Sequence, residues 1–267
     1  MAVNSHLVDC GTGFVVVDAQ LCVSDARAVR AAVEATGKPL LAVLLTHPHP
    51  DHYAGAAVLT KGLDVPFVAT HAVAAVVARD DAEKERVVAP MVGTEWPIER
   101  RFPDRVVEGG AVLTFGDVTF VVTDWGRGES HADSIWAIGH ETLCVGVLVY
   151  NGEHAYLADA HGETWLQGLT RLEGLLSPTS VLHLGHGRSG GAELVAPQRR
   201  YVETFLRAVG VALDLTPDVR KQHVLAAVRP LASNESLLFL AELSIEPVAQ
   251  VLRHAVAGAG PVEQEPA

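Results

Sequence analysis

The sequence predicts an α/β protein whose last part is entirely helical. Segments typical of strands and of helices alternate through residues 1–197, and only segments typical of helices follow. With 267 residues, of which 49% are hydrophobic, the chain can bury a large core. We expect one α/β domain over residues 1–197 and a helical extension over 198–256, packed on that domain or at a dimer interface. A small, acidic, proline-containing tail over 257–267 is expected to be disordered.

The first elements are short segments of both kinds. Residues 13–19 form a β-branched run after a glycine-rich turn, and residues 24–37 indicate a helix with Ser24 as N-cap and Gly37 as its end. Residues 39–46, PLLAVLLT, are a continuous apolar run too short for an independent helix. This run favours a strand that is buried on both faces.

Four further segments follow that strand. Residues 51–59 indicate a helix, residues 64–70 a short strand, and residues 72–88 a helix with one charged end. Residues 89–105 carry three prolines and are expected to be irregular, either as the cap of a pocket or as a surface excursion.

The second half has the same mixture before it becomes helical. Strands are predicted at residues 111–115, 118–125, 134–139, 142–150 and 179–187, with a helix at 162–177 between the last two. The helices expected after residue 197 lie at 198–210 and 216–228, with one or two more within 233–256. Of these, the second has the clearest start, because Thr216 suits the N-cap and Pro217 the first helical position.

Composition and charge exclude several functional classes. The net charge is −12, and the 20 Lys and Arg residues are scattered, so no nucleic acid partner is expected. No apolar run approaches the roughly 18 residues needed to span a bilayer, and the N-terminus lacks a secretory pattern. We therefore expect a cytoplasmic protein without membrane contact. The three cysteines have no C-x-x-C spacing and indicate neither a disulfide framework nor a cysteine zinc site.

Ligand-type side chains cluster directly after the buried strand, in the stretch THPHPDH. Side chains alternate along an extended backbone, and prolines hold the intervening positions extended, so His47 and His49 can reach the same point. Asp51 and His52 begin the next helix and can face a second point nearby. These side chains suit zinc or a similar divalent ion. The spacing therefore predicts metal binding at two adjacent positions.

THPHPDH and the motifs downstream resemble the metallo-β-lactamase-fold hydrolases over roughly residues 5–190. The resemblance implies an αββα sandwich, with two sheets face to face, helices outside and a metal site at one edge. It implies that His131 is the third histidine of the first metal, where relatives have Gly-His-Thr and this chain has Gly-Glu-Ser before the histidine. It also implies that His186, in a Gly-His-Gly, is the last ligand, with His183 as a competitor.

The chain departs from the family at the carboxylate that bridges the two metals. An aspartate is expected after Gly146, and Val147 stands there. Glu153 or Asp159 could substitute, although no spacing supports either. Three outcomes are open: a second metal without a bridging carboxylate, a single metal, or a site without catalysis. The two-metal outcome uses Asp51, His52 and His186 for the second ion, and the one-metal outcome uses His47, His49 and His131.

The resemblance implies a metal-dependent hydrolase with one or two zinc ions and a small-molecule substrate. A metal-bound hydroxide would attack an ester, lactone or thioester carbonyl, and Asp51 would orient the water and move its proton. Tyr150, His154 and Tyr156 are candidates for substrate binding, and Asp18 for support of the metal loop. Two alternatives remain: a β-lactamase-like amide hydrolase without the bridging aspartate, and a non-catalytic member that binds metal or a small molecule.

Overall fold

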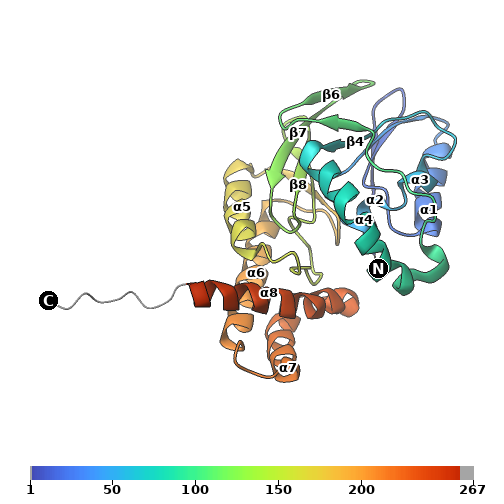
Figure 1. Ribbon diagram of the computed structural model, residues 1–267. Helices are drawn as coiled ribbons and strands as arrows, with labels where there is room; N and C mark the ends of the chain where they lie inside the picture. The colour runs from blue at the N-terminus through green and yellow to red at the C-terminus, as the bar shows by residue number, and fades with distance from the viewer. Residues whose placement is uncertain (1, 259–267) are drawn as a thin grey trace.

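The protein folds as an αββα sandwich, as predicted (Figure 1). The structure is a computed structural model, and it describes residues 2–258. Within those residues the strands form two five-stranded sheets. Helices cover the outer face of each sheet, and the inner faces pack against one another.

The first sheet is mostly parallel. Its strands, in spatial order, are β1 (His6–Asp9), β2 (Phe14–Val17), β3 (Leu40–Leu44), β4 (Phe67–Thr70) and β5 (Arg105–Val107). Only β1 runs antiparallel to its neighbour, and it has no counterpart among the predicted strands. Val17 pairs with Leu44, so β2 and β3 end at the same edge of the sheet. The loops that follow these two strands therefore start side by side.

The second sheet is mostly antiparallel. Its strands, in spatial order, are β10 (Val181–Leu184), β9 (Thr142–Gly146), β8 (Asp133–Ile138), β7 (Val118–Gly126) and β6 (Val112–Phe115). β9 and β10 are parallel and joined by the long crossover through helix α5. The core between the sheets contains Val17 and Leu44 of the first sheet and Phe120 and Trp136 of the second.

Helices fall into two sets by the sheet that they cover. On the first sheet lie α1 (Val23–Glu34), α2 (Pro50–Tyr53), α3 (Ala56–Leu59) and α4 (His71–Val92). Beside the second sheet lie α5 (Gly162–Leu175) and α6 (Val195–Val211), and α7 (Pro217–Val228) and α8 (Leu238–Gly258) pack on α6 and on each other. Single 3₁₀ turns occur at η1 (Gly93–Glu95), η2 (Ala192–Leu194), η3 (Arg229–Leu231) and η4 (Glu235–Leu237).

Several predicted helix boundaries were wrong. The single helix predicted over residues 51–59 is two short helices, α2 and α3. Helix α1 has Cys22 as its N-cap instead of Ser24, which lies inside the helix and donates from its backbone N–H to the Glu95 side chain at 2.8 Å. Helix α4 continues to Val92 through Pro90, in a segment that was predicted to be irregular. Its last turn packs on Leu21 and Trp96. This packing offsets the loss of a backbone hydrogen bond that a proline causes inside a helix.

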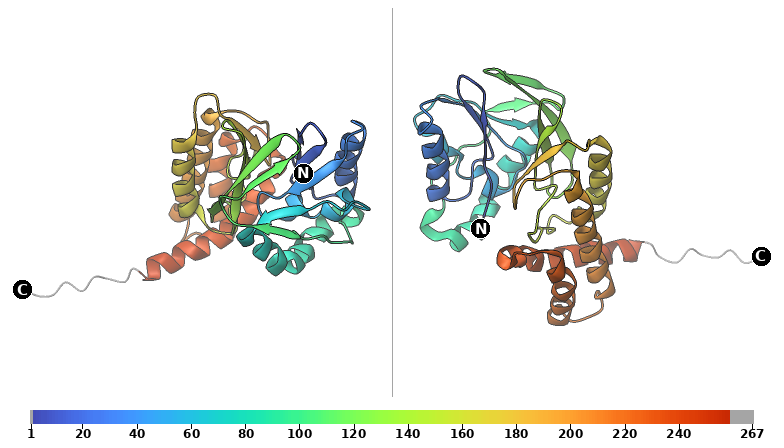
Figure 2. Two further views of the ribbon diagram at one scale, coloured as in Figure 1. Left: turned by 90° about the horizontal axis from the view of Figure 1, so that it is seen from above. Right: turned by 180° about the vertical axis from the view of Figure 1, so that it is seen from behind.

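Helices α6, α7 and α8 pack together with α5 and the second sheet. Their buried side chains, among them Phe205, Val224 and Ile245, belong to the same hydrophobic cluster as Val145 of β9 and Trp165 of α5. Helix α8 crosses the foot of the sandwich (Figure 1, Figure 2). The division at residue 197 stays a prediction. The predicted tail lies outside the described residues, except for residues 257–258, which end α8.

None of the helices in the described part of the chain combines the length and the apolar character that crossing a membrane requires.

Candidate metal centre

The histidine-rich loop begins where β3 ends, and the second sheet fixes its backbone. Trp136 donates from its indole nitrogen to the Leu45 carbonyl at 2.9 Å. The Thr46 carbonyl accepts from the Ser134 backbone N–H at 2.8 Å and from the Ser134 hydroxyl at 2.8 Å. Both donors belong to β8, so the loop is held between the two sheets.

Asp18 supports this loop from the end of β2. Its backbone is left-handed, with φ at 65°, and its side chain is buried. The carboxylate accepts from the Thr46 backbone N–H at 2.9 Å, from the Thr46 hydroxyl at 2.8 Å and from His52 Nδ1 at 2.9 Å. Its oxygens are thus already occupied by donors. This geometry agrees with the supporting role predicted for Asp18.

Protein partners also fix one nitrogen of the other rings. Because the Thr46 hydroxyl donates to Asp18, its oxygen accepts from His47 Nδ1, at 3.0 Å. His186 Nδ1 donates to the Ala2 carbonyl at 2.7 Å. The Nε2 atoms of His47, His52 and His186 are therefore the ring nitrogens left to face an ion. Such orientation by outer partners is typical of histidines that bind a metal.

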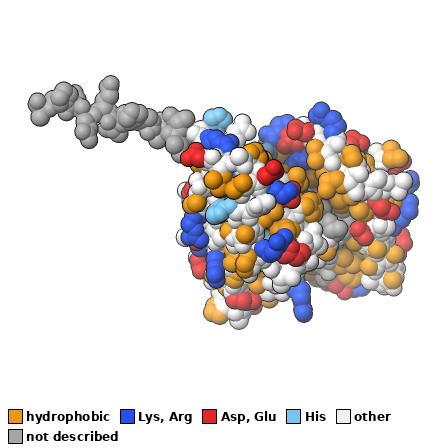
Figure 3. Space-filling model, turned by 90° about the horizontal axis from the view of Figure 1, so that it is seen from below, with side chains coloured by type: hydrophobic (Ala, Val, Ile, Leu, Met, Phe, Trp, Pro, Cys, Tyr) orange, Lys and Arg blue, Asp and Glu red, His pale blue; other side chains and the backbone are white. Residues whose placement is uncertain are grey.

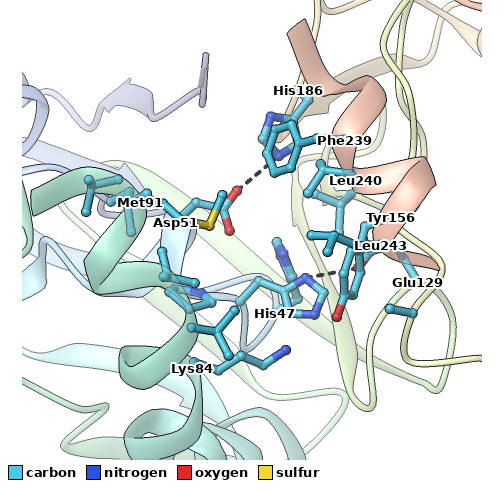
Figure 4. Close-up of a pocket in the computed structure, with 18 of the residues that line it drawn as sticks. His47, Asp51, Lys84, Met91, Glu129, Tyr156, His186, Phe239, Leu240 and Leu243 are labelled. Carbon is cyan, nitrogen blue, oxygen red and sulfur yellow. Dashed lines mark ion pairs between the residues drawn. The ribbon is translucent and has the colours of Figure 1, made fainter. Parts of the chain in front are cut away.

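Asp51, His52 and His186 form one group of candidate ligands, and their ligand atoms all lie within 4.8 Å of one another. Asp51 Oδ2 lies 3.1 Å from His186 Nε2 (Figure 4). It also lies 3.4 Å from His52 Nε2. Gly185 allows this approach, because a Cβ at that position would lie 2.6 Å from the His52 ring. The group therefore takes side chains from both sheets.

His47, His49 and Glu129 form another group within the same limit; we call it the first group, and Asp51, His52 and His186 the second group. Glu129 Oε2 lies 3.2 Å from His49 Nδ1, and Glu129 Oε1 accepts from the Tyr150 hydroxyl at 2.9 Å. Glu129 was not among the predicted ligands. The signal that could have found it is Gly-Glu-Ser in the place of the family's Gly-His-Thr, which puts Glu129 at the position of the histidine.

The donor atoms fit divalent ions. Ligand atoms bound tetrahedrally at about 2.05 Å lie about 3.3 Å apart, and three carboxylate–histidine separations in the two groups are 3.1, 3.2 and 3.4 Å. Among the described residues, His47 Nε2, His52 Nε2 and Glu129 Oε2 are buried without a hydrogen-bond partner. Buried polar atoms are rarely left unpaired, because the desolvation cost is then uncompensated. Ions at these two positions would satisfy all three atoms.

Neighbouring carboxylates determine the charge of two histidines in the centre. Burial disfavours the charged form of His49, but Glu129 and Asp159 outweigh it and raise the pKa of His49 to about 10. Burial likewise opposes charge on His52, whereas Asp51 and Asp18 raise its pKa to about 10. Both rings are protonated at neutral pH in the metal-free chain. Metal binding must therefore displace protons.

His131 lies outside both groups. Its Nδ1 is 2.7 Å from His161 Nε2, its Nε2 is 3.8 Å from Asp159 Oδ2, and 34% of its side chain is exposed. Asp159 also lies 3.4 Å from His49 Nε2, on the ring edge opposite Glu129. The structure thus connects His131 to His49 only through Asp159. Of the six predicted ligands, five are brought into the two groups.

Of the three predicted substrate-binding residues, two line a cavity and one does not. Tyr150 and Tyr156 line a cavity next to the two groups. Tyr150 stacks on the His186 ring, with 5.3 Å between the two ring centroids. His154 is buried away from this cavity, with its Nδ1 2.9 Å from the Tyr201 hydroxyl. Val147, the residue in the place of the bridging aspartate, lines the cavity as an apolar side chain.

The cavity has a volume of about 490 Å³ and opens between α4 and α8. The two ligand groups contribute His47, His49, Asp51, Glu129 and His186 to its lining. Apolar side chains of α4 and α8 form much of the remaining wall, among them Met91 and Leu243 (Figure 4). Lys84 adds one cation, 5.6 Å from the centroid of the Tyr156 ring. From below, the surface is hollowed between two lobes, with hydrophobic side chains on either side (Figure 3).

Ligand-type side chains gathered from two sheets at one edge of an αββα sandwich define a class of metal-binding proteins. The chain belongs to the metallo-beta-lactamase superfamily, whose sequence pattern matches residues 1–193. No curated protein matches the chain.

Solved structures share the fold at low sequence identity. A metallo-beta-lactamase family protein from Thermus thermophilus has a TM-score of 0.70 at 19% identity, with 96% of this chain and 89% of that chain covered. A beta-lactamase domain protein from Burkholderia ambifaria has a TM-score of 0.67 at 22% identity, covering 96% and 82%. A metallo-beta-lactamase from Pontibacter korlensis has a TM-score of 0.63 at 19% identity, covering 75% and 88%. The first two similarities extend beyond residue 193 into the C-terminal helices.

Proposed function

We propose that the protein is a metal-dependent hydrolase that cleaves an ester, lactone or thioester bond of a small molecule. The observation that carries the proposal is the pair of ligand groups, with unpartnered nitrogen and carboxylate atoms, in the wall of an apolar cavity. Divalent ions, with zinc as the first candidate, would supply a water of lowered pKa and polarise a carbonyl. The superfamily consists mostly of metallo-hydrolases, which supports the same conclusion.

The side chains of this chain supply positioning and proton handling. Asp51 faces His52 and His186 and is the candidate to orient the attacking water and accept its proton. In the metal-free chain burial raises the pKa of Asp51, but the neighbouring histidines outweigh this and hold it well below its usual range. Asp51 is therefore ionised and able to accept a hydrogen bond. The hydroxyl of Tyr156 is the candidate donor to a substrate oxygen.

The cavity wall favours a substrate with an apolar acyl chain. A volume of about 490 Å³ suits a small molecule, and Val87, Met91, Phe239 and Leu243 present only hydrocarbon or thioether surface. Val147 removes a carboxylate from the reaction centre and adds to this surface. We propose that the acyl carbonyl lies at the ligand groups and that the chain extends between α4 and α8.

Metal content and a substrate panel test this proposal together. Protein purified without chelator is analysed for bound metal and assayed on acyl esters, lactones, thioesters and β-lactams. We expect turnover of acyl substrates that is lost on chelation and restored by a divalent ion. Asp51→Asn should lower kcat by about 100-fold or more, and Asp64→Asn, an exposed control, should not.

Other outcomes would contradict the proposal and select an alternative. Cleavage of β-lactams alone would replace acyl-ester hydrolysis with amide hydrolysis. Metal-loaded protein without turnover on any of the four substrate classes would favour the non-catalytic binding role.

A further inference from the structure

The turn that carries Glu129 is organised around a buried carboxylate. Asp133 Oδ2 accepts from the backbone N–H groups of Gly128 at 3.0 Å and Ser130 at 3.1 Å, and its Oδ1 accepts from the Ser130 hydroxyl at 3.0 Å. Gly128 has no room for a side chain, because a Cβ would lie 2.6 Å from Leu148. Both neighbours of Glu129 are thus fixed, and the backbone sets where its side chain starts.

The Glu129 carboxylate is almost completely buried, and Tyr150 is its one hydrogen-bond donor among the described residues. Tyr150 donates to Oε1, whereas Oε2 lies 3.2 Å from His49 Nδ1 without the geometry of a hydrogen bond. Two atoms that bind the same ion have such a separation. Burying a carboxylate oxygen without a hydrogen-bond partner is costly, and an ion between Glu129 Oε2 and His49 Nδ1 would offset that cost.

His131, the histidine expected from the family pattern, does not compete for this place. Its two nitrogens face His161 and Asp159, and its side chain is partly exposed. Asp159 in turn reaches the outer nitrogen of His49, and Lys84 Nζ lies 3.9 Å from its other oxygen. His131 therefore belongs to a polar network outside the ligand groups.

We infer that Glu129 is the third protein ligand of the first metal position, which makes it a site of two histidines and one carboxylate. The second group, Asp51 with His52 and His186, has the same composition. The centre then has one carboxylate for each ion, although Val147 has removed the shared one. The inference rests on the metal centre of the proposed function and is independent of its substrate. The ligands suit first-row divalent ions, and a carboxylate in the place of a histidine favours Mn²⁺ and Fe²⁺ more than three histidines would.

Metal stoichiometry and the Co²⁺ absorption spectrum test the inference without an activity assay. The wild-type chain should bind two Co²⁺ ions. Glu129→Ala should bind one, with the remaining ion held by the second group. His131→Ala, the matched control, should still bind two. Glu129→His restores three histidines, so it should bind two ions and shift the visible Co²⁺ bands through the added nitrogen ligand.

Three results would overturn the inference. They are two ions bound with unchanged bands in Glu129→Ala, loss of an ion in His131→Ala but not in Glu129→Ala, and no ion bound by the folded wild-type chain. Circular dichroism of each variant identifies misfolding, and Glu129→Gln provides an isosteric second variant that should also lose affinity at the first position. A protein that binds two ions but hydrolyses nothing would refute the proposed function and leave this inference intact.

Discussion

Asp18 acts on the second ligand group through the His52 ring. In Asp18→Asn the side-chain amide would direct an N–H toward Thr46 or toward His52 Nδ1, which are both donors to the carboxylate. The His52 ring would then turn or change tautomer. We expect metal affinity at the second group to fall about 10- to 100-fold, as loss of such outer partners usually causes. Competition with a chromophoric chelator measures it.

The matched control for this change is Asp64→Asn, at an exposed site. Equal affinities in the two variants would show that Asp18 does not orient His52.

Tyr150 is a positioning residue for Glu129, because its hydroxyl is the hydrogen-bond donor to Oε1. Tyr150→Phe keeps the ring that stacks on His186 and removes only that bond. We expect affinity at the first metal position to fall about 10-fold or more, with little change at the second. Tyr201→Phe is the control, since its hydroxyl contacts His154 away from the cavity. The same loss in both variants would contradict the assignment.

The sequence predicted the part of the site that depends on local spacing. His47, His49, Asp51 and His52 lie within one loop, so alternation along the backbone was enough to group them. Glu129 depends on a turn folded around Asp133 and on a hydroxyl 21 residues away, which no local pattern reports. A histidine two residues further along offered the more familiar ligand type.

At the scale of elements, α4 and α8 determine what enters the cavity. Leu243 is half-exposed at the mouth, so a substitution there changes the wall with little effect on the core. We expect Leu243→Glu to lower kcat/KM for a hexanoyl ester relative to an acetyl ester by about 10-fold, because each buried methylene contributes about 0.8 kcal/mol. The two kcat/KM values, measured for both esters, give the ratio.

Val251→Glu is the control on the same helix, at an exposed position that is not part of the cavity lining. An unchanged ester ratio in Leu243→Glu would place the acyl chain elsewhere.

Arg220 ties the C-terminal helices together. Its buried guanidinium donates to the carbonyls of Ala212, Leu213 and Leu215 at the end of α6, and pairs with Glu246 of α8. Arg220→Ala leaves these carbonyls without their donor, so we expect a loss of about 3 kcal/mol in the free energy of unfolding. Chemical denaturation measures it.

The neighbouring Lys221 provides the comparison for Arg220. It pairs with Glu242 at the surface, and Lys221→Ala should cost less than about 1 kcal/mol. Similar losses in the two variants would mean that the carbonyls find other donors.

Most elements were predictable because their apolar pattern is local, as in the buried run that became β3. The errors arose where tertiary contacts override local preference. Helix α4 passes through Pro90 because partly buried side chains of its last turn pack against Trp96, and β1 forms because it pairs with β2. The sequence of neither segment indicates the contact that the segment makes in the fold.

For the whole molecule, bound metal should raise stability. Ligands that bind only the folded state stabilise it by about 2.7 kcal/mol at 100 times Kd, which corresponds to a shift of roughly 5 to 10 °C in Tm for a chain of this size. We therefore expect EDTA to lower Tm by that amount. His47→Ala should respond less, because it has lost a ligand of the first group. Equal Tm values with and without EDTA for the wild-type chain would contradict metal binding to the folded state.

Each ligand group takes side chains from both halves of the sandwich. His47, His49, Asp51 and His52 follow the first sheet, whereas Glu129 and His186 come from the second. An ion at either position would link the two sheets through its ligands. Separation of the sheets would break the coordination of the ion, so the rate of metal release should rise with this opening. Mild denaturant should accelerate transfer of the ion to a chelator well before the helices melt.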